Sequence, residues 1–197
     1  MIPDTAPEDT RTLILQTAEG LFMRHGYGAV SMNQIVSEIS KVRRLTKPAI
    51  YYHFEDKERL FAAVMFNAME RHGRALMAAA QTEGNLQTRL VALAETVIRG
   101  RPRHFERAQA DFRDHASEET LAVFRATLVR SLVAPLVAAF AQAGAQGELR
   151  AGVSPEIAAA GFFGIVTGLD FILPDSGTPE DLARRAVDIY LHGIAAP

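Results

Sequence analysis

The residues best suited to chemistry form one short run between Thr46 and Phe54. Thr46 is a good helix N-cap, and Pro48 in the first turn loses only an amide that has no intrahelical partner. Ile50 and Phe54 lie four residues apart, so both fall on one face of the predicted helix. The residues left on the outward face are Lys47, Ala49, Tyr51, Tyr52 and His53. Their hydroxyl and cationic donors suit phosphates and base edges, which indicates a nucleic-acid partner.

Two helix starts flank this run. Asp56 caps the next helix, and Lys57 sits in its first turn, where a cation opposes the helix dipole by about 0.3 to 1 kcal/mol. A nearby phosphate would reverse that penalty. Upstream, Ser31 and Gln34 form a capping box, and the first-turn amides there can dock a phosphate. Capping alone is the other interpretation of Ser31.

These residues, together with Phe22, Gly26, Tyr27, Met32 and Ile35, resemble the N-terminal helix-turn-helix of the TetR family of transcriptional regulators. The resemblance covers residues 10 to 61 and implies an all-helical homodimer with a small-molecule pocket in its C-terminal part. It also implies that the partner is double-stranded operator DNA. The expected DNA-contacting residues are Ser31, Arg43, Arg44, Thr46, Lys47, Pro48, Ala49, Tyr51, Tyr52, His53 and Lys57. Lys47, Tyr51, Thr46 and Lys57 are expected on phosphates, and Ala49, Tyr52 and His53 nearer the bases.

The chain departs from the family pattern between Ile39 and Leu45, where it holds about one helical turn more than is usual. Either the second helix is longer or the turn is an expanded loop. Ile35, Ile39 and Val42 continue one apolar face, which favours the longer helix. Arg43 and Arg44 in this stretch are expected to add phosphate contacts flanking the half-site, with a solvated charge pair as the alternative.

Composition sets limits on the function. The 197 residues are 48% hydrophobic and 22% charged and contain no cysteine, which excludes disulfides, thiolate zinc sites and cysteine nucleophiles. The net charge of −2 by itself argues against a nucleic-acid partner. However, the stretch from Lys41 to Phe54 holds four lysines and arginines and no acid, and a symmetric dimer presents this patch twice.

The fold is expected to be all-α, because no stretch alternates like a strand. We expect a helix-turn-helix DNA-binding domain in residues 1–58 and a helical ligand-binding and dimerisation domain in residues 59–197. Helices are predicted from Asp56 to about Ala80, from Asn85 to Gly100, from Ser117 to Gly144, and after Ser154 and Thr178. Pro135 should kink the third of these.

A stripe of small residues marks the penultimate helix. Ala160, Gly164 and Gly168 recur every four residues with Gly161 beside them, so another helix can approach closely. With Leu182, Ala186 and Ile189 of the last helix they form the expected homodimer interface; burial inside one chain is the alternative.

The stretch 157–173 is apolar but holds Asp170 and three glycines, which indicates a buried helix rather than a membrane span. The N-terminal residues lack the pattern of a signal peptide, so a cytoplasmic location without a membrane partner is expected.

Aromatic and methionine side chains between the long helices are the candidates for a ligand pocket. Such a set is also typical of plain core. The candidates are Met65, Met69, Phe105, Phe112, Phe124 and Leu128, with Arg101, Gln109 or His115 as polar anchors. Asp111 and His115 have the spacing of a metal-binding pair on one helix, but further ligands are missing, so neither a metal nor another cofactor is expected.

The sequence therefore predicts a transcriptional regulator, with repression favoured, that binds palindromic DNA as a homodimer and is released by a small, largely apolar effector. No catalytic motif is present, so an enzyme is not expected. The alternative is a dimeric helical small-molecule-binding or interaction protein without sequence-specific DNA binding. In such a protein Lys47, Tyr51 and Tyr52 would have no evident task. The effector and the operator sequence stay open.

Overall fold

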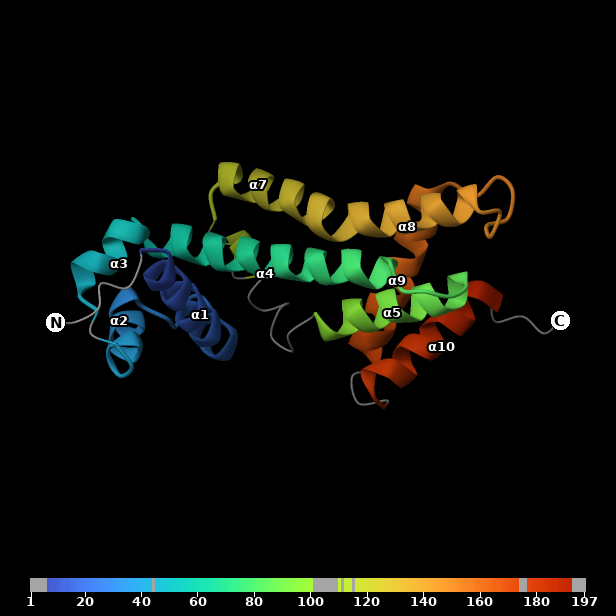
Figure 1. The fold of residues 1–197 in the computed structure, drawn as a ribbon. Helices are drawn as coiled ribbons and strands as arrows, with labels where there is room; N and C mark the ends of the chain where they lie inside the picture. Colours follow the sequence, from blue (N-terminus) through green and yellow to red (C-terminus); the bar gives the residue numbers. More distant parts are fainter. Residues whose placement is uncertain are drawn as a thin grey trace. The chain divides into compact units, whose positions relative to one another are not determined.

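The computed structural model describes residues 7–43, 45–100, 110, 112–114, 116–173 and 177–192, in which helices are joined by turns and loops (Figure 1). No strand occurs in those ranges, in agreement with the predicted all-α fold. The named elements are α1 (Pro7–His25), α2 (Met32–Ser40), α3 (Lys47–His53), α4 (Lys57–Ala80), α5 (Leu86–Arg99), α7 (Glu118–Leu128), the π-helical segment η1 (Val129–Val133), α8 (Ala134–Ala145), α9 (Pro155–Ile172) and α10 (Pro179–His192).

The described residues group into two compact units. Unit 1 takes those within Met1–Ala68 and Pro102–Arg125, and unit 2 those within Met69–Arg101 and Ala126–Pro197. Helix α4 therefore contributes its first half to unit 1 and its second half to unit 2.

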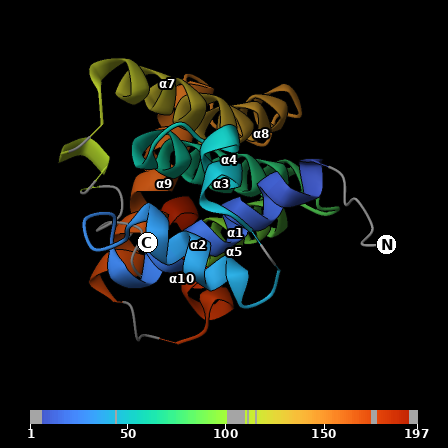
Figure 2. The ribbon, with the colours of Figure 1, turned by 90° about the vertical axis from the view of Figure 1, so that its left-hand side faces the viewer.

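An aromatic core holds unit 1 together. Helices α1, α2 and α3 are grouped in this unit (Figure 2), and Phe61 of α4 lies fully buried beside them. The Phe61 ring meets those of Phe22 and Tyr27 edge-on, each at 4.9 Å between centroids. On its other side it contacts Phe112 at 5.4 Å. Because aromatic pairs of this kind add to the gain from burial, they fix the start of α4 to α1 and the turn that follows it.

The second helix ends earlier than the apolar pattern predicted. Helix α2 stops at Ser40, and Val42, expected on its inward face, is 83% exposed. The Ser40 hydroxyl lies 2.7 Å from the Val36 carbonyl oxygen and 3.3 Å from the Leu45 carbonyl oxygen, which draws the chain back toward α3. The prediction of a longer helix is therefore wrong, and the extra residues form an expanded turn.

Helices α5, α8, α9 and α10 form the bundle of unit 2. Helix α10 packs on α5 and α9, and α9 packs on α8. The rings of Phe140, Phe162 and Tyr190 meet in the centre with centroids 5.5 to 5.9 Å apart. The Tyr190 hydroxyl donates a hydrogen bond of 2.9 Å to the Ala158 carbonyl, and burial raises the pKa of this phenol. This bond ties α10 to α9.

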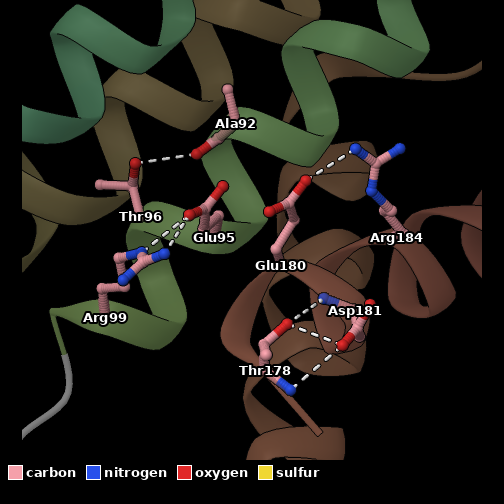
Figure 3. A network of polar contacts seen from close by, with 8 residues as sticks. All are labelled: Ala92, Glu95, Thr96, Arg99, Thr178, Glu180, Asp181 and Arg184. Atoms are coloured by element: carbon pink, nitrogen blue, oxygen red, sulfur yellow. Dashed lines mark hydrogen bonds and ion pairs between the residues drawn. The ribbon is translucent and has the colours of Figure 1, made fainter.

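Local capping explains where the last helix begins. Thr178 and Asp181 bond reciprocally: the Asp181 amide donates to the Thr178 hydroxyl at 3.1 Å, and the Asp181 carboxylate accepts from that hydroxyl at 2.7 Å (Figure 3). The bonds that the Asp181 carboxylate accepts from the Thr178 hydroxyl and the Thr178 amide lower its pKa. Ser154 likewise accepts from the amide of Ile157 at the start of α9. Both helix starts were predicted from the sequence, since a hydroxyl precedes proline and an acid in each.

The long helix predicted from Ser117 to Gly144 runs from Glu118 to Ala145, with the π-helical segment η1 in its middle. Pro135 follows η1 as the second residue of α8. Because proline has no N–H, the carbonyl of Ser131 four residues earlier lacks its α-helical donor. A π-helical stretch, which accommodates an extra residue, is a usual response to such a defect.

Candidate nucleic-acid interface

Helix α3 presents the face that the sequence predicted. Ile50 and Phe54 are buried, whereas Thr46, Lys47, Pro48, Tyr51 and Tyr52 are exposed and Ala49 and His53 are half-buried. Thr46 has the extended backbone of an N-cap, but its hydroxyl makes no capping bond. It is therefore available to another partner.

The aromatic side chains of α3 are supported by their neighbours. The Lys47 ammonium lies 5.9 Å from the centre of the Tyr51 ring, and the Tyr52 and His53 rings meet edge-on at 5.4 Å. Tyr52 is 85% exposed and Tyr51 39% exposed. An exposed aromatic pair flanked by a cation combines apolar contact area with hydrogen-bond donors, and both suit a DNA groove.

The start of α2 offers a second set of donors. Ser31 and Gln34 form the predicted capping box: the Ser31 amide donates to the Gln34 side chain at 2.7 Å, and the Gln34 amide donates to the Ser31 hydroxyl oxygen at 3.2 Å. The first turn holds no acidic residue. Because the Ser31 oxygen accepts the capping bond, its own proton stays free for a phosphate oxygen.

Lys57 has a structural partner that the sequence did not reveal. Its ammonium donates a 3.1 Å hydrogen bond to the Tyr27 carbonyl and lies 4.1 Å from the centre of the Tyr27 ring. Burial, followed by the negative charges of Glu58 and Asp56, raises the pKa of the Tyr27 phenol. Lys57 thus joins the start of α4 to the turn that follows α1. Since an ammonium has three donors, this bond leaves others for a phosphate.

The expanded turn between α2 and α3 carries further cations. Lys41 pairs with Glu38 at 2.7 Å, and this hydrogen bond lowers the pKa of the Glu38 carboxyl. Arg43 is half-buried, and its amide bonds to the Ile39 carbonyl at 2.9 Å. Arg44 lies outside the described residues. The described residues of this turn lead directly into the first turn of α3.

Comparison with known proteins agrees with this geometry. The family model of the bacterial regulatory proteins of the tetR family matches residues 14–64. The crystal structure of AibR in complex with isovaleryl coenzyme A and operator DNA is 30% identical, with a TM-score of 0.65, over 91% of this chain and 96% of AibR. The chain belongs to the TetR family.

Other TetR-family members resemble the chain over most of its length. The transcriptional regulator TtgR of Pseudomonas putida is 26% identical over 182 residues, covering 86% of this chain and 83% of TtgR. A TetR/AcrR regulator from Thermobifida fusca is 25% identical with a TM-score of 0.71, covering 95% and 100% of the two chains. The protein is therefore a transcriptional regulator and not an enzyme.

The residues predicted to line a ligand pocket fall into two groups. Met65, Phe112 and Phe124 are buried in unit 1, where the tilted rings of Phe112 and Phe124 lie 5.0 Å apart between centroids. Met69 and Leu128 belong to unit 2. The remaining candidates, Arg101, Phe105, Gln109 and His115, lie outside the described residues.

A hollow of about 410 Å³ between α1 and α2 was not predicted. It contains no residue of α3. The lining residues are Leu21, His25, Ala29, Val30, Gln34, Ser37 and Glu38.

Helix α9 carries an exposed apolar stripe. Ala160, Gly161 and Gly164 are exposed and Gly168 is half-buried. A methyl group added at Gly164 or Gly168 would meet no atom within 4 Å, so packing inside this chain does not require either glycine. The large residues Ile157, Phe171 and Ile172 continue the stripe at both ends, and the helical spacing could have revealed them.

The residues predicted on α10 lie differently. Leu182 and Ala186 are buried in the core of unit 2, and Ile189 is half-buried. The structure thus gives Leu182 and Ala186 the alternative role, burial inside one chain.

In the described part of the chain no three His, Asp or Glu side chains cluster as metal ligands, and the pair Asp111 and His115 lies outside it.

Proposed function

We propose that the protein represses transcription as a homodimer that binds a near-palindromic duplex operator through α3 of each copy. The observation that supports this most is the outward face of α3. A lysine and two tyrosines lie on this seven-residue helix, and the free hydroxyl of the N-cap Thr46 lies beside them. The inward residue Ile50 and the C-cap residue Phe54 are buried in the core. A recognition helix of this kind docks in the major groove, with half-sites about one helical turn, 34 to 36 Å, or somewhat more apart.

The contacts divide by chemistry. Thr46, Lys47, Tyr51 and Lys57 bind phosphates, which sets register and affinity but not sequence. Ala49, Tyr52 and His53 lie nearer the base edges and set the preferred sequence. Ser31 at the start of α2, Pro48 in the first turn of α3 and the arginines Arg43 and Arg44 complete the surface.

The homodimer forms through α9. Its stripe of Ala160, Gly161, Gly164 and Gly168 lets a second helix approach closely, and the exposed Ile157, Phe171 and Ile172 bury apolar area at both ends. Ile189 of α10 lies at the edge. Each mid-helix glycine costs about 1 kcal/mol relative to alanine, a cost that a close helix crossing explains.

An effector releases the operator by acting on the C-terminal domain, residues 59–197, and the signal reaches the DNA-binding domain, residues 1–58, through α4. This helix belongs to both compact units and begins only a few residues after α3 ends. A tilt of α4 would change the distance between the recognition helices of a dimer. The relative AibR has been crystallised with isovaleryl coenzyme A and operator DNA, which supports a two-ligand mode of action. Roughly 3 kcal/mol of differential effector affinity suffices for about a hundredfold loss of DNA affinity.

We infer a cytoplasmic location without a membrane partner. Two helical stretches, Glu118–Ala145 and Pro155–Ile172, are long and apolar enough to cross a membrane by length and composition alone. A dimer contact on α9 accounts for the exposed apolar residues of the second stretch.

The competing function is a dimeric small-molecule-binding protein that lacks sequence-specific DNA binding. Selection of duplex DNA from a random pool separates the two. The proposal predicts enrichment of one near-palindromic sequence by the wild type and loss of that enrichment in the variant Lys47→Ala with Tyr52→Ala. A pool that stays random after repeated rounds with the wild type would exclude the proposed operator binding.

A further inference from the structure

Two buried residues of unit 2 carry hydroxyl groups that make no hydrogen bond to a described atom. Apart from Tyr27 with its phenol, Thr127 and Ser131 are the only residues with a polar side chain that are buried among the described residues, at 5% and 8% exposure. Neither hydroxyl bonds to a described atom, and neither oxygen is fully sealed from accessible space. By contrast, Thr96 and Thr167 bond back to the carbonyls of Ala92 and Phe163 at 2.8 and 2.7 Å; Figure 3 shows the first of these bonds.

This lack of partners calls for a physical explanation. A helical serine or threonine normally satisfies its hydroxyl with the carbonyl four residues earlier, as Thr96 and Thr167 do. Because neither oxygen is fully sealed, a water molecule or a ligand group can reach each hydroxyl. Groups of this kind are therefore often reserved for a bound water or ligand.

The two hydroxyls lie within and just before an irregular part of the helix. Ser131 belongs to η1, and Thr127 precedes that segment by two residues. π-helical segments are rare and occur frequently at functional sites. Helix α4 touches η1 here: a methyl group at Gly73 would stand 2.6 Å from the Ser131 carbonyl oxygen and 3.1 Å from its Cβ. A molecule bonded to the Ser131 hydroxyl must therefore lie beside this contact or widen it.

The surroundings in unit 2 define what could bind. Met69 and Leu76, four residues before and three residues after Gly73, lie on the same face of α4 and are buried. His72 is packed on Gly100 at the end of α5, and burial lowers its pKa, so the ring is neutral near pH 7. No charged side chain is buried among the described residues, so none of these residues offers a buried counter-ion to a charged ligand group.

We propose that Thr127 and Ser131 form the hydrogen-bonding end of the effector site, and that the effector is an uncharged, largely apolar molecule carrying one hydroxyl or carbonyl group. The inference rests on the proposed function in that it takes the protein to have an effector. Occupation of the site widens the contact between Gly73 and Ser131. The effector thereby displaces α4, the helix that leads to the DNA-binding domain.

The first test needs no ligand and compares matched threonines. Thr127→Val removes an unpaired hydroxyl at constant shape, so the melting temperature of the ligand-free protein should stay equal or rise. Thr96→Val and Thr167→Val each remove a hydroxyl that has a partner, so both should lower the melting temperature by a few degrees. If Thr127→Val lowers it as much as the two controls do, the hydroxyl is satisfied within the protein and the proposal fails.

The second test uses three probes of one shape: 1-naphthol, 1-methylnaphthalene and 1-naphthoate. Calorimetry on the wild-type protein should show binding of 1-naphthol, up to tenfold weaker binding of 1-methylnaphthalene and no binding of the anion. The variant Thr127→Val with Ser131→Ala should bind the first two alike. An unchanged preference in the variant, or no binding of 1-naphthol to the wild type, would overturn the proposal.

The two proposals fail in different ways. The probe measurements use protein without DNA, so they stand even if the wild type binds no operator, an outcome that would count against the proposed function alone. If operator binding is intact in Thr127→Val with Ser131→Ala while the preference for 1-naphthol persists, only the assignment of the effector site is wrong.

Discussion

The close approach of α4 to η1 gives a prediction about Gly73. Alanine is a better helix former than glycine by about 1 kcal/mol, so a mid-helix Gly→Ala change stabilises a helix where there is room. At Gly73 there is none, because the added methyl would stand 2.6 Å from the Ser131 carbonyl oxygen, a backbone atom. Overpacking of this kind costs about 1 to 3 kcal/mol, which offsets or exceeds the helix gain.

Gly20 in the middle of α1 provides the matched control. A methyl group there would first meet the end of the flexible Arg24 side chain at 3.4 Å, which is ordinary contact. Gly20→Ala should therefore stabilise the protein by up to about 1 kcal/mol. We expect the free energies of unfolding of the two variants to differ by about 1 to 3 kcal/mol, with Gly73→Ala the less stable.

Urea denaturation followed by circular dichroism at 222 nm, at one protein concentration for all samples, measures this difference. The reasoning would be refuted if Gly73→Ala were as stable as Gly20→Ala. That result would mean that α4 and η1 are not in backbone contact.

Four further predictions concern other parts of the molecule. Lys57→Ala should lower the free energy of unfolding by about 1 to 2 kcal/mol, because the contacts of Lys57 with Tyr27 are removed. An unchanged melting temperature would contradict this. The same variant should bind all DNA sequences more weakly and to the same extent. Gly164→Leu should force the paired helices apart, so sedimentation that still shows an intact dimer would place the interface elsewhere. The double variant Arg43→Ala with Arg44→Ala should reduce the slope of log affinity against log salt by about 0.9 for each phosphate that the arginines no longer neutralise. An unchanged slope would mean that the two arginines make no phosphate contacts. The free energy of unfolding should fall as the pH drops below about 6.5, because the unfolded chain protonates His72 at its ordinary pKa while the folded protein does so only at a lower pH. His72→Gln should reduce this fall. Identical pH profiles of the variant and the wild type would refute the role of His72.

Local features of the structure were predictable from the sequence. The inward pair Ile50 and Phe54 defines the outward face of α3, because a four-residue spacing fixes side-chain direction on a helix. The starts of α9 and α10 follow from Ser154 and Thr178, since capping depends only on neighbouring residues.

Features that depend on distant residues were not predictable. Val42 continues an apolar pattern, yet none of the described elements packs on it and its side chain is exposed. The spacing of apolar residues does not show whether another element will pack on them. The bond from Lys57 to Tyr27 joins residues 30 positions apart. Leu182 and Ala186 form an apolar face on α10, but the sequence does not say whether that face meets its own chain or a second copy.

The central claim is that the outward face of α3 reads DNA sequence. Fluorescence anisotropy with the selected operator and a scrambled duplex of equal length, over 50 to 200 mM salt, tests it most directly. We predict that the wild type prefers the operator by about a thousandfold or more and that log affinity falls linearly with log salt for both duplexes. We also predict that Tyr52→Ala loses most of the preference while keeping the salt slope. Equal affinity of the wild-type protein for the two duplexes would contradict the claim.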